Sequence, residues 1–386
     1  MRPKPQTSNY ANSPDIDPHL PERRITATIP LSRGRGLSVD IEPINFKAVE
    51  FAEIAGWASD AHELAFATLL KSCRKSGTQT PVCEAALALG DNANRETARA
   101  FFEAHYSPHA VEGYSSSGFV TGYYEPEVRG SRERVGAFQI PVYRRPDDLV
   151  TLVPDTYRAR FNEQLTAMRR DGNQFVPYYT REDIEAGALE GQDLELLYLD
   201  DPVELFFLQV QGSGLVRLSD GSTTRLSYAG KNGYPYTSIG KLLVERGELA
   251  RDAASMDALK AWLRADAERA RRLMLENRSY IFFRELWAHE MEAGPIGAEG
   301  VALTPGRSLA VDASYHVLGT PIFVAAPGLR DEEGRPFQRL MIAQDVGSAI
   351  AGPERGDIFF GSGEVAGALA GSARQDARFF ILIPRE

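Results

Sequence analysis

Three aspartates near the C-terminal end of the chain have the type and the surroundings that acid–base chemistry requires. Each lies at the end of an apolar run and beside a turn: Asp312 in LAVDAS, Asp345 in MIAQDVG and Asp357 in RGDIFFGSG. A carboxyl group beside a buried strand is partly removed from water, which raises its pKa and makes it a candidate general acid near neutral pH. A simpler interpretation stays open, because aspartates at strand ends often form turns by accepting hydrogen bonds from their own backbone.

The sequence lacks the common motifs of other catalytic chemistries. It contains no H-E-x-x-H metal motif, no G-x-S-x-G nucleophile motif and no phosphate-binding P-loop. The QGSG stretch at 211–214 has the composition of a glycine-rich turn, which does not bind phosphate by itself. We therefore expect neither a metal ion nor an organic cofactor.

The composition is that of a globular protein. At 386 residues, with 43% hydrophobic and 25% charged residues, the chain is long enough for two domains with separate cores. Its longest apolar runs, such as FFILI at 379–383, have the length of buried strands and not the roughly 18 residues of a membrane helix. The formal net charge of −10 argues against a nucleic-acid-binding protein.

The two cysteines and the N-terminal segment give weaker signals. Cys73 and Cys83 have no companion His/Cys cluster, which excludes a typical zinc site, and the composition leaves open a disulfide or two buried thiols. Residues 1–40 begin without the apolar region of a signal peptide or a lipidation cysteine. They are rich in Pro, Asn and Ser, and we expect a disordered lead.

Two parts of the chain have the periodicity of helices. From about residue 44 to 108, apolar residues recur at helical spacing, and Ser59-Asp60 followed by Glu63 resembles a capping box. Asn94 precedes a second amphipathic stretch in this part. Residues 236–246 and 255–275 return to the same periodicity, with Ser255 as the expected N-cap.

Short β-branched and aromatic runs predict strands elsewhere. Between Gly118 and about residue 230 these runs are FVTGYYEPEV, FQIPVYR, LELLYL, VELFFLQVQGSG and LVRLSDGSTTRLSYAG. Within the last run, SDGS at 219–222 is a hairpin-turn signal. The last hundred residues contribute SLAVDAS, PIFVAA, RLMIAQD, DIFFGSG and RFFILIP. The alternation of helical and strand regions predicts an α+β fold, mainly β, with at least one closed β-barrel.

Several of these segments together resemble the membrane-bound lytic murein transglycosylase A family. The matching segments are GFVTGYYEPEV (118–128), QIPVYRRP (139–146), FFLQVQGSGLVRLSDG (206–221), YAGKNGYPYTSIG (228–240) and NRSYIFF (277–283). The three C-terminal aspartates are similar to those of the family's 3D domain. The segments follow one another in order over about residues 110–386, roughly three-quarters of the chain.

The resemblance implies a double-psi β-barrel with a smaller β-barrel-like domain inserted into it and a glycan-binding groove between the two. In this chain the barrel domain would comprise 41–121, which includes the N-terminal helices, and 284–386, with the 3D region at about 305–386. The inserted domain would comprise 122–283.

The implied activity is that of a peptidoglycan lytic exotransglycosylase. Such an enzyme cleaves the β-1,4 bond between N-acetylmuramic acid and N-acetylglucosamine and leaves a 1,6-anhydromuramyl end. Asp357 matches the family's acid/base in a D-I-aromatic-x-G motif, with Phe359 where the family often has tyrosine. The resemblance gives Asp345 a supporting role and Asp312 a supporting or structural one.

Aromatic, amide and hydroxyl side chains of the matching segments are expected to contact sugar rings and N-acetyl groups. Each of them has a plainer interpretation as a core or turn residue. The expected substrate-binding residues are Tyr123, Tyr124, Gln209, Gln211, Ser213, Asn232 and Tyr236.

Two other functions stay open at this stage: a peptidoglycan-binding protein without turnover, and a hydrolytic muramidase on the same fold. The expected partner is the glycan strand, with peripheral membrane or cell-wall-enzyme partners in addition, and the expected state is a monomer. The expected location is the periplasm or cell envelope, in association with the outer membrane or free of it. Since the periplasm is oxidising, the resemblance adds weight to a Cys73–Cys83 disulfide.

Overall fold

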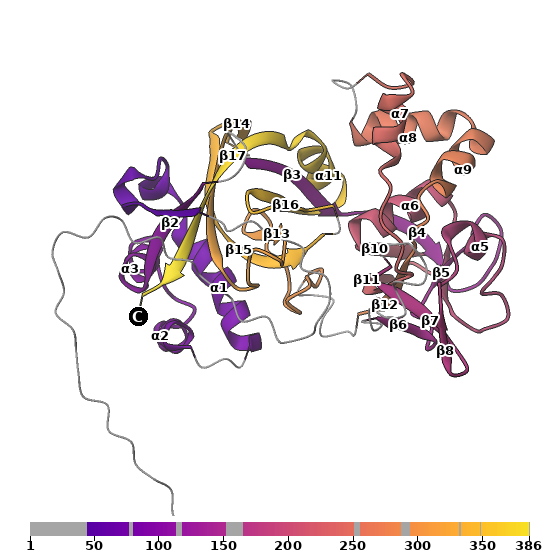
Figure 1. Cartoon of the computed structure of the whole chain (residues 1–386), viewed down its shortest axis with the longest axis horizontal. Helices are drawn as coiled ribbons and strands as arrows, with labels where there is room; N and C mark the ends of the chain where they lie inside the picture. The colour runs from indigo at the N-terminus through magenta and orange to yellow at the C-terminus, as the bar shows by residue number, and fades with distance from the viewer. Residues whose placement is uncertain are drawn as a thin grey trace, which may run out of the picture.

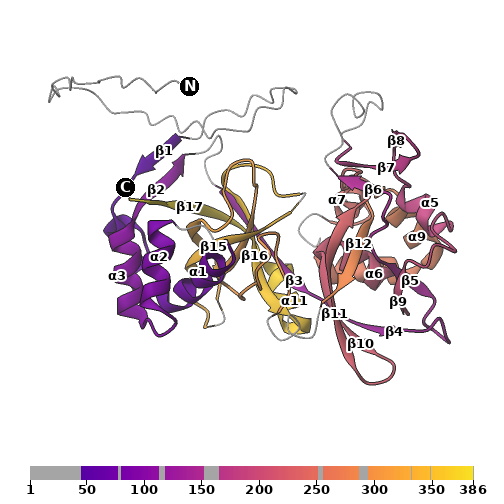
Figure 2. The same cartoon turned by 90° about the horizontal axis from the view of Figure 1, so that it is seen from below.

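The structure is a computed structural model that describes residues 45–76, 80–112, 118–151, 165–250, 255–286, 294–331, 333–347 and 349–385. The lead expected at 1–40 lies outside these residues. Figures 1 and 2 show two lobes side by side. We call the described residues of 45–125 and 294–385 the barrel lobe, and those of 126–286 the insert lobe.

Six strands of the barrel lobe close into a barrel (Figure 1). Around the barrel they are β17 (Arg374–Pro384), β14 (Pro321–Arg330), β15 (Pro336–Val346), β13 (Ser308–Val311), β16 (Arg355–Ser362) and β3 (Gly118–Glu125), which pairs back to β17. The β13–β15 and β16–β3 pairs are parallel and the other four are antiparallel. Because side chains alternate across each strand, one set fills the interior, including Val120, Leu309, Val324, Met341, Ile358 and Phe379. The predicted closed barrel in a mainly-β fold is confirmed.

The N-terminal helices cover the outside of the barrel. They are α1 (His62–Ser76), α2 (Pro81–Leu89) and α3 (Arg95–His105). Asn94, which precedes the second predicted helical stretch, caps α3 by accepting a hydrogen bond from the Thr97 amide. Their apolar faces pack on outward-facing residues of β14, β15 and β17, such as Phe323, Leu340 and Phe380. Strands β1 (Asn45–Ala48) and β2 (Tyr106–Glu112) extend the sheet beyond β17. Helix α11 (Gly363–Ser372) was not predicted.

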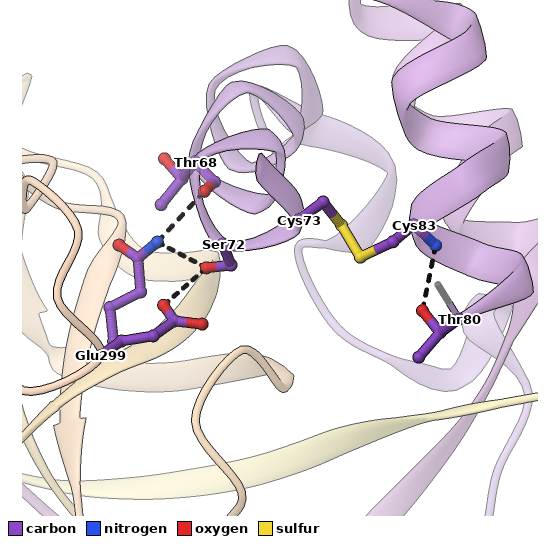
Figure 3. The surroundings of a disulfide bond; sticks show 7 residues. Thr68, Ser72, Cys73, Thr80, Cys83 and Glu299 are labelled. Atoms are coloured by element: carbon purple, nitrogen blue, oxygen red, sulfur yellow. Dashed lines mark hydrogen bonds between the residues drawn. A yellow bond between two sulfur atoms is a disulfide. The ribbon is translucent and has the colours of Figure 1, made fainter. Parts of the chain in front are cut away.

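A disulfide on one side and hydrogen bonds on the other hold helix α1 in place (Figure 3). Cys73 in α1 and Cys83 in α2 form a disulfide, with 5.2 Å between their Cα atoms. Next to it, the Ser72 hydroxyl donates a hydrogen bond to Glu299 (2.7 Å) and accepts one from the Gln344 amide (2.8 Å). The helix is therefore bonded covalently to its neighbour and by hydrogen bonds to the barrel.

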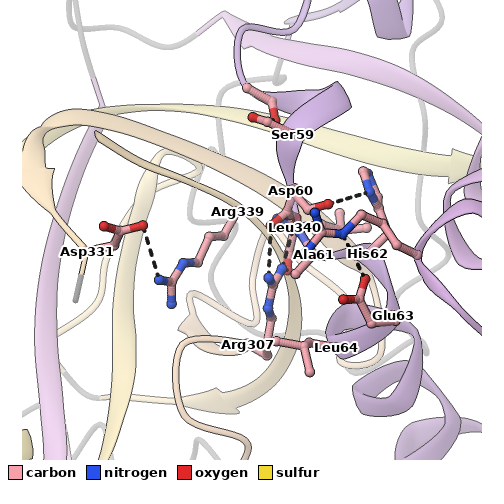
Figure 4. Close-up of polar contacts among 12 residues, drawn as sticks. Ser59, Asp60, Ala61, His62, Glu63, Leu64, Arg307, Asp331, Arg339 and Leu340 are labelled. Atoms are coloured by element: carbon pink, nitrogen blue, oxygen red, sulfur yellow. Dashed lines mark hydrogen bonds and ion pairs between the residues drawn. The ribbon is translucent and has the colours of Figure 1, made fainter. Parts of the chain in front are cut away.

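A buried ion pair links the start of α1 to the barrel (Figure 4). Asp60 and Arg307 are only 5% and 3% exposed. The two guanidinium nitrogens of Arg307 donate to the two Asp60 oxygens at 2.8 and 2.9 Å, and the Leu340 amide of β15 donates to Asp60 at 2.7 Å. The geometry is bidentate, which gives the strongest form of such a pair.

The predicted capping box at Ser59-Asp60 is wrong. The Ser59 hydroxyl donates to the carbonyl of Gly56 instead, and α1 begins only at His62. The reason is a tertiary contact. Asp60 forms an ion pair with Arg307 and is part of the core rather than of a solvent-exposed helix end.

The insert lobe is a six-stranded sheet with helices around it. The strand order is β12 (Ile281–Glu285), β11 (Thr223–Lys231), β10 (Ser213–Leu218), β4 (Glu127–Ser131), β9 (Glu195–Leu199) and β5 (Ile140–Tyr143). An isolated bridge between Arg144 and Phe283 joins the two edges of this sheet, which makes the lobe barrel-like. A three-stranded sheet lies beside it, formed by β6 (Leu149–Thr151), β7 (Ala167–Asp171) and β8 (Gln174–Val176).

Five helices complete the described part of the insert lobe: α5 (Arg181–Glu185), α6 (Pro202–Gln211), α7 (Ile239–Glu245), α8 (Met256–Ala265) and α9 (Ala267–Leu275). Ser255 caps α8 as predicted. The strand predicted for VELFFLQVQGSG is wrong over most of its length, because Asp201 caps α6, Pro202 occupies its first turn and Gly212 ends it in a left-handed conformation. These end signals outweigh the strand propensity of the aromatic residues between them.

The first of the two connections between the lobes is short. Strand β3 of the barrel lobe ends at Glu125 and β4 of the insert lobe begins at Glu127, so that Pro126 alone separates them. Glu125 is fully buried, forms an ion pair with Arg225 of β11 (2.8 Å) and accepts a hydrogen bond from the Ser362 hydroxyl (2.6 Å).

No helix in the described part of the chain is both long and apolar enough to cross a membrane.

Candidate functional site

Two adjoining cavities, of about 270 and about 760 Å³, lie where the lobes face each other. Both are lined by Tyr123, Gly347 and Ile350 of the barrel lobe, and by Gln209 and Gln211 of the insert lobe, so that they form one continuous groove. We call it the interlobe groove. All three aspartates singled out in the sequence line it: Asp357 the smaller cavity, and Asp312 and Asp345 the larger.

Asp357 lies inside a strand and not beyond its end as the sequence suggested. It is the third residue of β16, opposite Thr121 of β3 and Ala310 of β13. Its Oδ1 accepts hydrogen bonds from the Thr121 hydroxyl and from the Arg355 guanidinium (2.7 Å), which also donates to Thr121 Oγ1 (2.7 Å). Within the described residues Oδ2 has no hydrogen-bond partner, which leaves it available to a ligand.

The surroundings of Asp357 raise its pKa. Removal from water is the main cause, and the charge and hydrogen bond of Arg355 act in the opposite direction without cancelling it. The side chain keeps 22% of its surface exposed, toward the groove that it lines. The group is thus a carboxyl that retains its proton to higher pH than usual and can reach a ligand.

Asp345 and Tyr123 form a second polar pair beside it. Asp345 accepts hydrogen bonds from the amides of Ala298 and Val346 and from the Tyr123 hydroxyl, all at 2.9 Å. Burial raises the pKa of Asp345, and the charge of Asp357 adds to this effect, while the three donors oppose it. Burial and both carboxylates raise the pKa of Tyr123, which therefore stays a neutral donor.

Asp312 follows β13 and forms a turn. Its Oδ1 accepts from the Ser314 amide (2.9 Å), its Oδ2 from the Gly352 amide (2.8 Å), and its carbonyl from the His316 amide (3.0 Å). The side chain thereby ties the loop after β13 to the loop before β16. For this aspartate the structure favours the turn-forming interpretation.

The insert lobe contributes most of the other residues expected in the groove. Gln209 and Gln211 lie in the last turn of α6, where Gln209 donates to the Ile281 carbonyl (3.3 Å) and Gln211 accepts from the Tyr124 amide (3.2 Å). Ser213, at the start of β10, and Tyr236 also line the groove. Amides, hydroxyls and an aromatic ring thus face the aspartates across it.

Two residues expected in the groove lie elsewhere. Tyr124 is 8% exposed and packs on Ala366 and Ala370 of α11, because it points to the side of β3 opposite to Tyr123. Asn232 is fully buried, and its amide group makes three 2.9 Å hydrogen bonds, to the carbonyls of Tyr179 and Arg278 and from the amide of Tyr280. Neither lines the two cavities, and both have structural roles.

Sequence reasoning missed three residues of the site. Arg355 carried a usable signal, since it is two positions before Asp357 and alternate residues of a strand share a face. Thr121 comes from another strand, and nothing local connected it to Asp357. Lys231 lies in the motif YAGKNGYPY and lines the larger cavity, and nothing in the motif distinguishes it from an ordinary exposed lysine.

The described ranges contain no group of three or more His, Cys, Asp or Glu side chains arranged to hold a metal ion. What the groove does contain is a ligand-accessible carboxyl with a raised pKa, held by Thr121 and Arg355 and faced by polar groups of the insert lobe. This arrangement can transfer a proton to and from a bound polar ligand.

Comparisons with known proteins agree with the resemblance found in the sequence. The profile of the MltA specific insert domain matches residues 119–284, and that of the 3D domain matches residues 307–383. Membrane-bound lytic murein transglycosylase A of Escherichia coli K12 is 35% identical over 280 residues, which cover 70% of this chain and 68% of that protein. The Vibrio cholerae protein of the same name is 34% identical over 268 residues, 68% of this chain and 64% of that protein, just under two thirds of its length.

Solved structures are similar over most of their length. The crystal structure of the membrane-bound lytic murein transglycosylase from Agrobacterium tumefaciens is 38% identical, with a TM-score of 0.79, and covers 88% of this chain and 98% of its own. The crystal structure of E. coli MltA with bound chitohexaose is 30% identical, with a TM-score of 0.66, and covers 90% of this chain and 96% of its own.

Proposed function

Because this chain belongs to the membrane-bound lytic murein transglycosylase A family, we propose that it cleaves the β-1,4 bond between N-acetylmuramic acid and N-acetylglucosamine in peptidoglycan and forms a 1,6-anhydromuramyl end. The observation that carries this proposal is the position of Asp357, which is buried enough to raise its pKa and yet lines the groove between the lobes. The related E. coli enzyme binds chitohexaose, which supports an oligosaccharide as the ligand of this groove.

The proposed reaction needs one carboxyl group. Asp357 protonates the glycosidic oxygen as the bond to C1 breaks, and its carboxylate then accepts the proton of the muramic acid C6 hydroxyl, which attacks C1. Since the nucleophile belongs to the substrate, the attack is intramolecular and gains from a high effective concentration. Thr121 and Arg355 hold Oδ1, which leaves Oδ2 for the proton transfers.

The remaining residues support this acid. Asp345 and the Tyr123 hydroxyl form a fixed hydrogen-bonded pair in the same groove, beside the acid. Gln209, Gln211, Ser213 and Tyr236 are the proposed sugar contacts, since they line the groove with groups that suit hydroxyl and N-acetyl partners.

Strand pairing supports a small change in the domain limits. The inserted domain was expected at 122–283, but β3 still pairs with β16 at Glu125, and β12 pairs with β11 as far as Glu285. We therefore place the inserted domain at 126–285. The curated relatives are named membrane-bound, and the location proposed for this chain is the periplasmic face of the cell envelope.

Mass spectrometry of digested peptidoglycan tests the proposed reaction. Purified protein should release muropeptides that end in 1,6-anhydromuramic acid and are lighter by one water than the products of hydrolysis. Products that carry the added water would instead establish a hydrolytic muramidase. Binding without any product would leave a peptidoglycan-binding protein, and either result rejects the proposed reaction.

Replacing Arg355 with glutamine should change the pH dependence of this activity. The acid must be protonated to act, so kcat/KM falls as pH rises through the pKa of Asp357. Arg355 lowers that pKa, and its loss should move the alkaline limb of the kcat/KM profile to higher pH. Arg378→Gln, on an exposed position of β17, is the matched control and should leave the limb in place. An alkaline limb that stays in place or moves to lower pH in Arg355→Gln contradicts the assignment of Asp357.

A further inference from the structure

Lys231 is a cation inside the interlobe groove. It is the last residue of β11 in the insert lobe and lines the larger cavity together with Tyr228 and Ser227. The side chain is half-buried, and this burial lowers the pKa of its ammonium group. The cavity wall opposite belongs to the barrel lobe and includes Asp312 and Asp345.

The ammonium group of Lys231 has no ion-pair or hydrogen-bond partner among the described residues, whereas three other lysines do. Lys71 donates to a carbonyl and a hydroxyl, Lys241 pairs with a glutamate, and Lys260 pairs with Glu204. The aspartates of the opposite wall are already occupied, Asp312 by backbone amides and Asp345 by amides and Tyr123. A cation that is removed from water without a partner is costly, and an anionic group of a ligand would offset that cost.

We propose that Lys231 binds a carboxylate carried by the glycan and thereby distinguishes peptidoglycan from neutral β-1,4-linked oligosaccharides. This inference rests on the proposed function, because it takes a glycan strand as the ligand of the groove. N-acetylmuramic acid carries a lactyl ether whose carboxyl group is either free or extended by a stem peptide with carboxylates of its own. Both sources present the same chemistry to an ammonium group on a flexible stem, which can meet an anion from several directions.

The geometry separates this contact from the proton transfer. Lys231 lines the larger cavity and does not line the smaller one, where Asp357 lies, while Tyr123, Gln209 and Gln211 line both. The carboxylate bound by Lys231 therefore belongs to a part of the strand away from the bond that is cleaved. It contributes to affinity and selection of the strand and not to the chemical step.

Binding measurements with three ligands test this inference. Calorimetry on the full chain in the Asp357→Asn background, in which cleavage is expected to be about 10³-fold slower, would compare chitohexaose, glycan strands stripped of peptides by an amidase, and peptide-bearing strands. Lys231→Met should weaken binding of the carboxylate-bearing strands by about tenfold, as expected for one hydrogen bond to a charged group. Its affinity for chitohexaose should stay within about twofold of the parent, and Lys231→Arg should restore strand binding.

The pattern of loss identifies the source of the carboxylate. A loss confined to stripped strands indicates the lactyl carboxylate, and a loss confined to peptide-bearing strands indicates the stem peptide. An equal loss for all three ligands, or no loss for either strand, overturns the inference. Lys241→Met, on the exposed face of α7, is the matched control and should bind all three ligands as the parent does.

These measurements distinguish a failure of this inference from a failure of the proposed function. Chitohexaose binding reports that each variant is folded, and Lys231→Gln, which stays polar, replaces Lys231→Met if the latter fails to fold. A parent chain that forms no anhydro product but still distinguishes the strands through Lys231 separates the two proposals. In that case the proposed reaction fails and the carboxylate contact stands.

Discussion

Asp357→Asn is expected to reduce the rate of anhydromuropeptide release by about 10³-fold, within the range of about 10²- to 10⁴-fold typical of general acid–base catalysis. The amide cannot supply a proton to the glycosidic oxygen, nor accept one from the C6 hydroxyl. Its Oδ1 can still accept the hydrogen bonds from Thr121 and Arg355, so the loss should come from chemistry and not from a displaced side chain. Chromatographic quantification of products over time measures this rate.

The same variant should be no less stable than the parent at neutral pH. A carboxyl whose pKa is raised on folding contributes stability below its unfolded-state pKa, and this contribution is lost as pH rises through the folded-state pKa. Above that range the parent keeps a buried charge that asparagine does not carry. Thermal unfolding at neutral and acidic pH should therefore show any advantage of the variant at neutral pH only.

Asp376→Asn is the matched control for both measurements, since Asp376 is an exposed aspartate on barrel strand β17 outside the groove. It should keep the parent's rate and stability. An Asp357→Asn variant that turns over at a rate close to that of the parent would remove Asp357 from the mechanism.

Asp60→Ala should destabilise the barrel lobe by about 3–5 kcal/mol, the usual cost of removing one partner of a buried ion pair. The substitution leaves the Arg307 guanidinium, 3% exposed, without its counter-charge, and leaves the Leu340 amide without its acceptor. Urea unfolding followed by tryptophan fluorescence, to which the buried Trp57 next to this pair contributes, measures the change.

Glu268→Ala is the control for this variant. Glu268 pairs with Arg272 on the exposed face of α9, with both side chains more than 60% exposed, and such a pair is worth about 0.5 kcal/mol or less. If Asp60→Ala costs no more than Glu268→Ala, the pair does not anchor α1 to the barrel.

Much of the fold followed from local patterns in the sequence. The strands around the barrel, the hairpin at 219–222 and the cap at Ser255 all depend on alternation, turn residues and cap residues that lie within a few positions of one another. The two wrong predictions have different causes. Residues 202–211 look like a strand by propensity and form a helix because of their two ends, and Asp60 looks like a cap and forms a core ion pair with a residue 247 positions away.

Some features of the site could also be predicted from nearby residues in the sequence, and others could not. The raised pKa of Asp357 was expected from its apolar neighbours in the sequence, whereas its bond to Thr121 depends on a parallel pairing between strands 236 positions apart. Tyr123 and Tyr124 show the limit of composition most clearly. They are adjacent and chemically identical, yet the alternation of β3 turns one toward the groove and the other under α11. Only the three-dimensional arrangement tells which of the two faces the ligand.

The single residue between β3 and β4 has a mechanical consequence. A proline at this junction has a fixed φ and no amide hydrogen, and Glu125 beside it is held by Arg225 and Ser362, so the joint is stiff. A displacement of the insert lobe is therefore passed along this backbone directly to β3, where Thr121, which holds Asp357, lies five residues before Pro126.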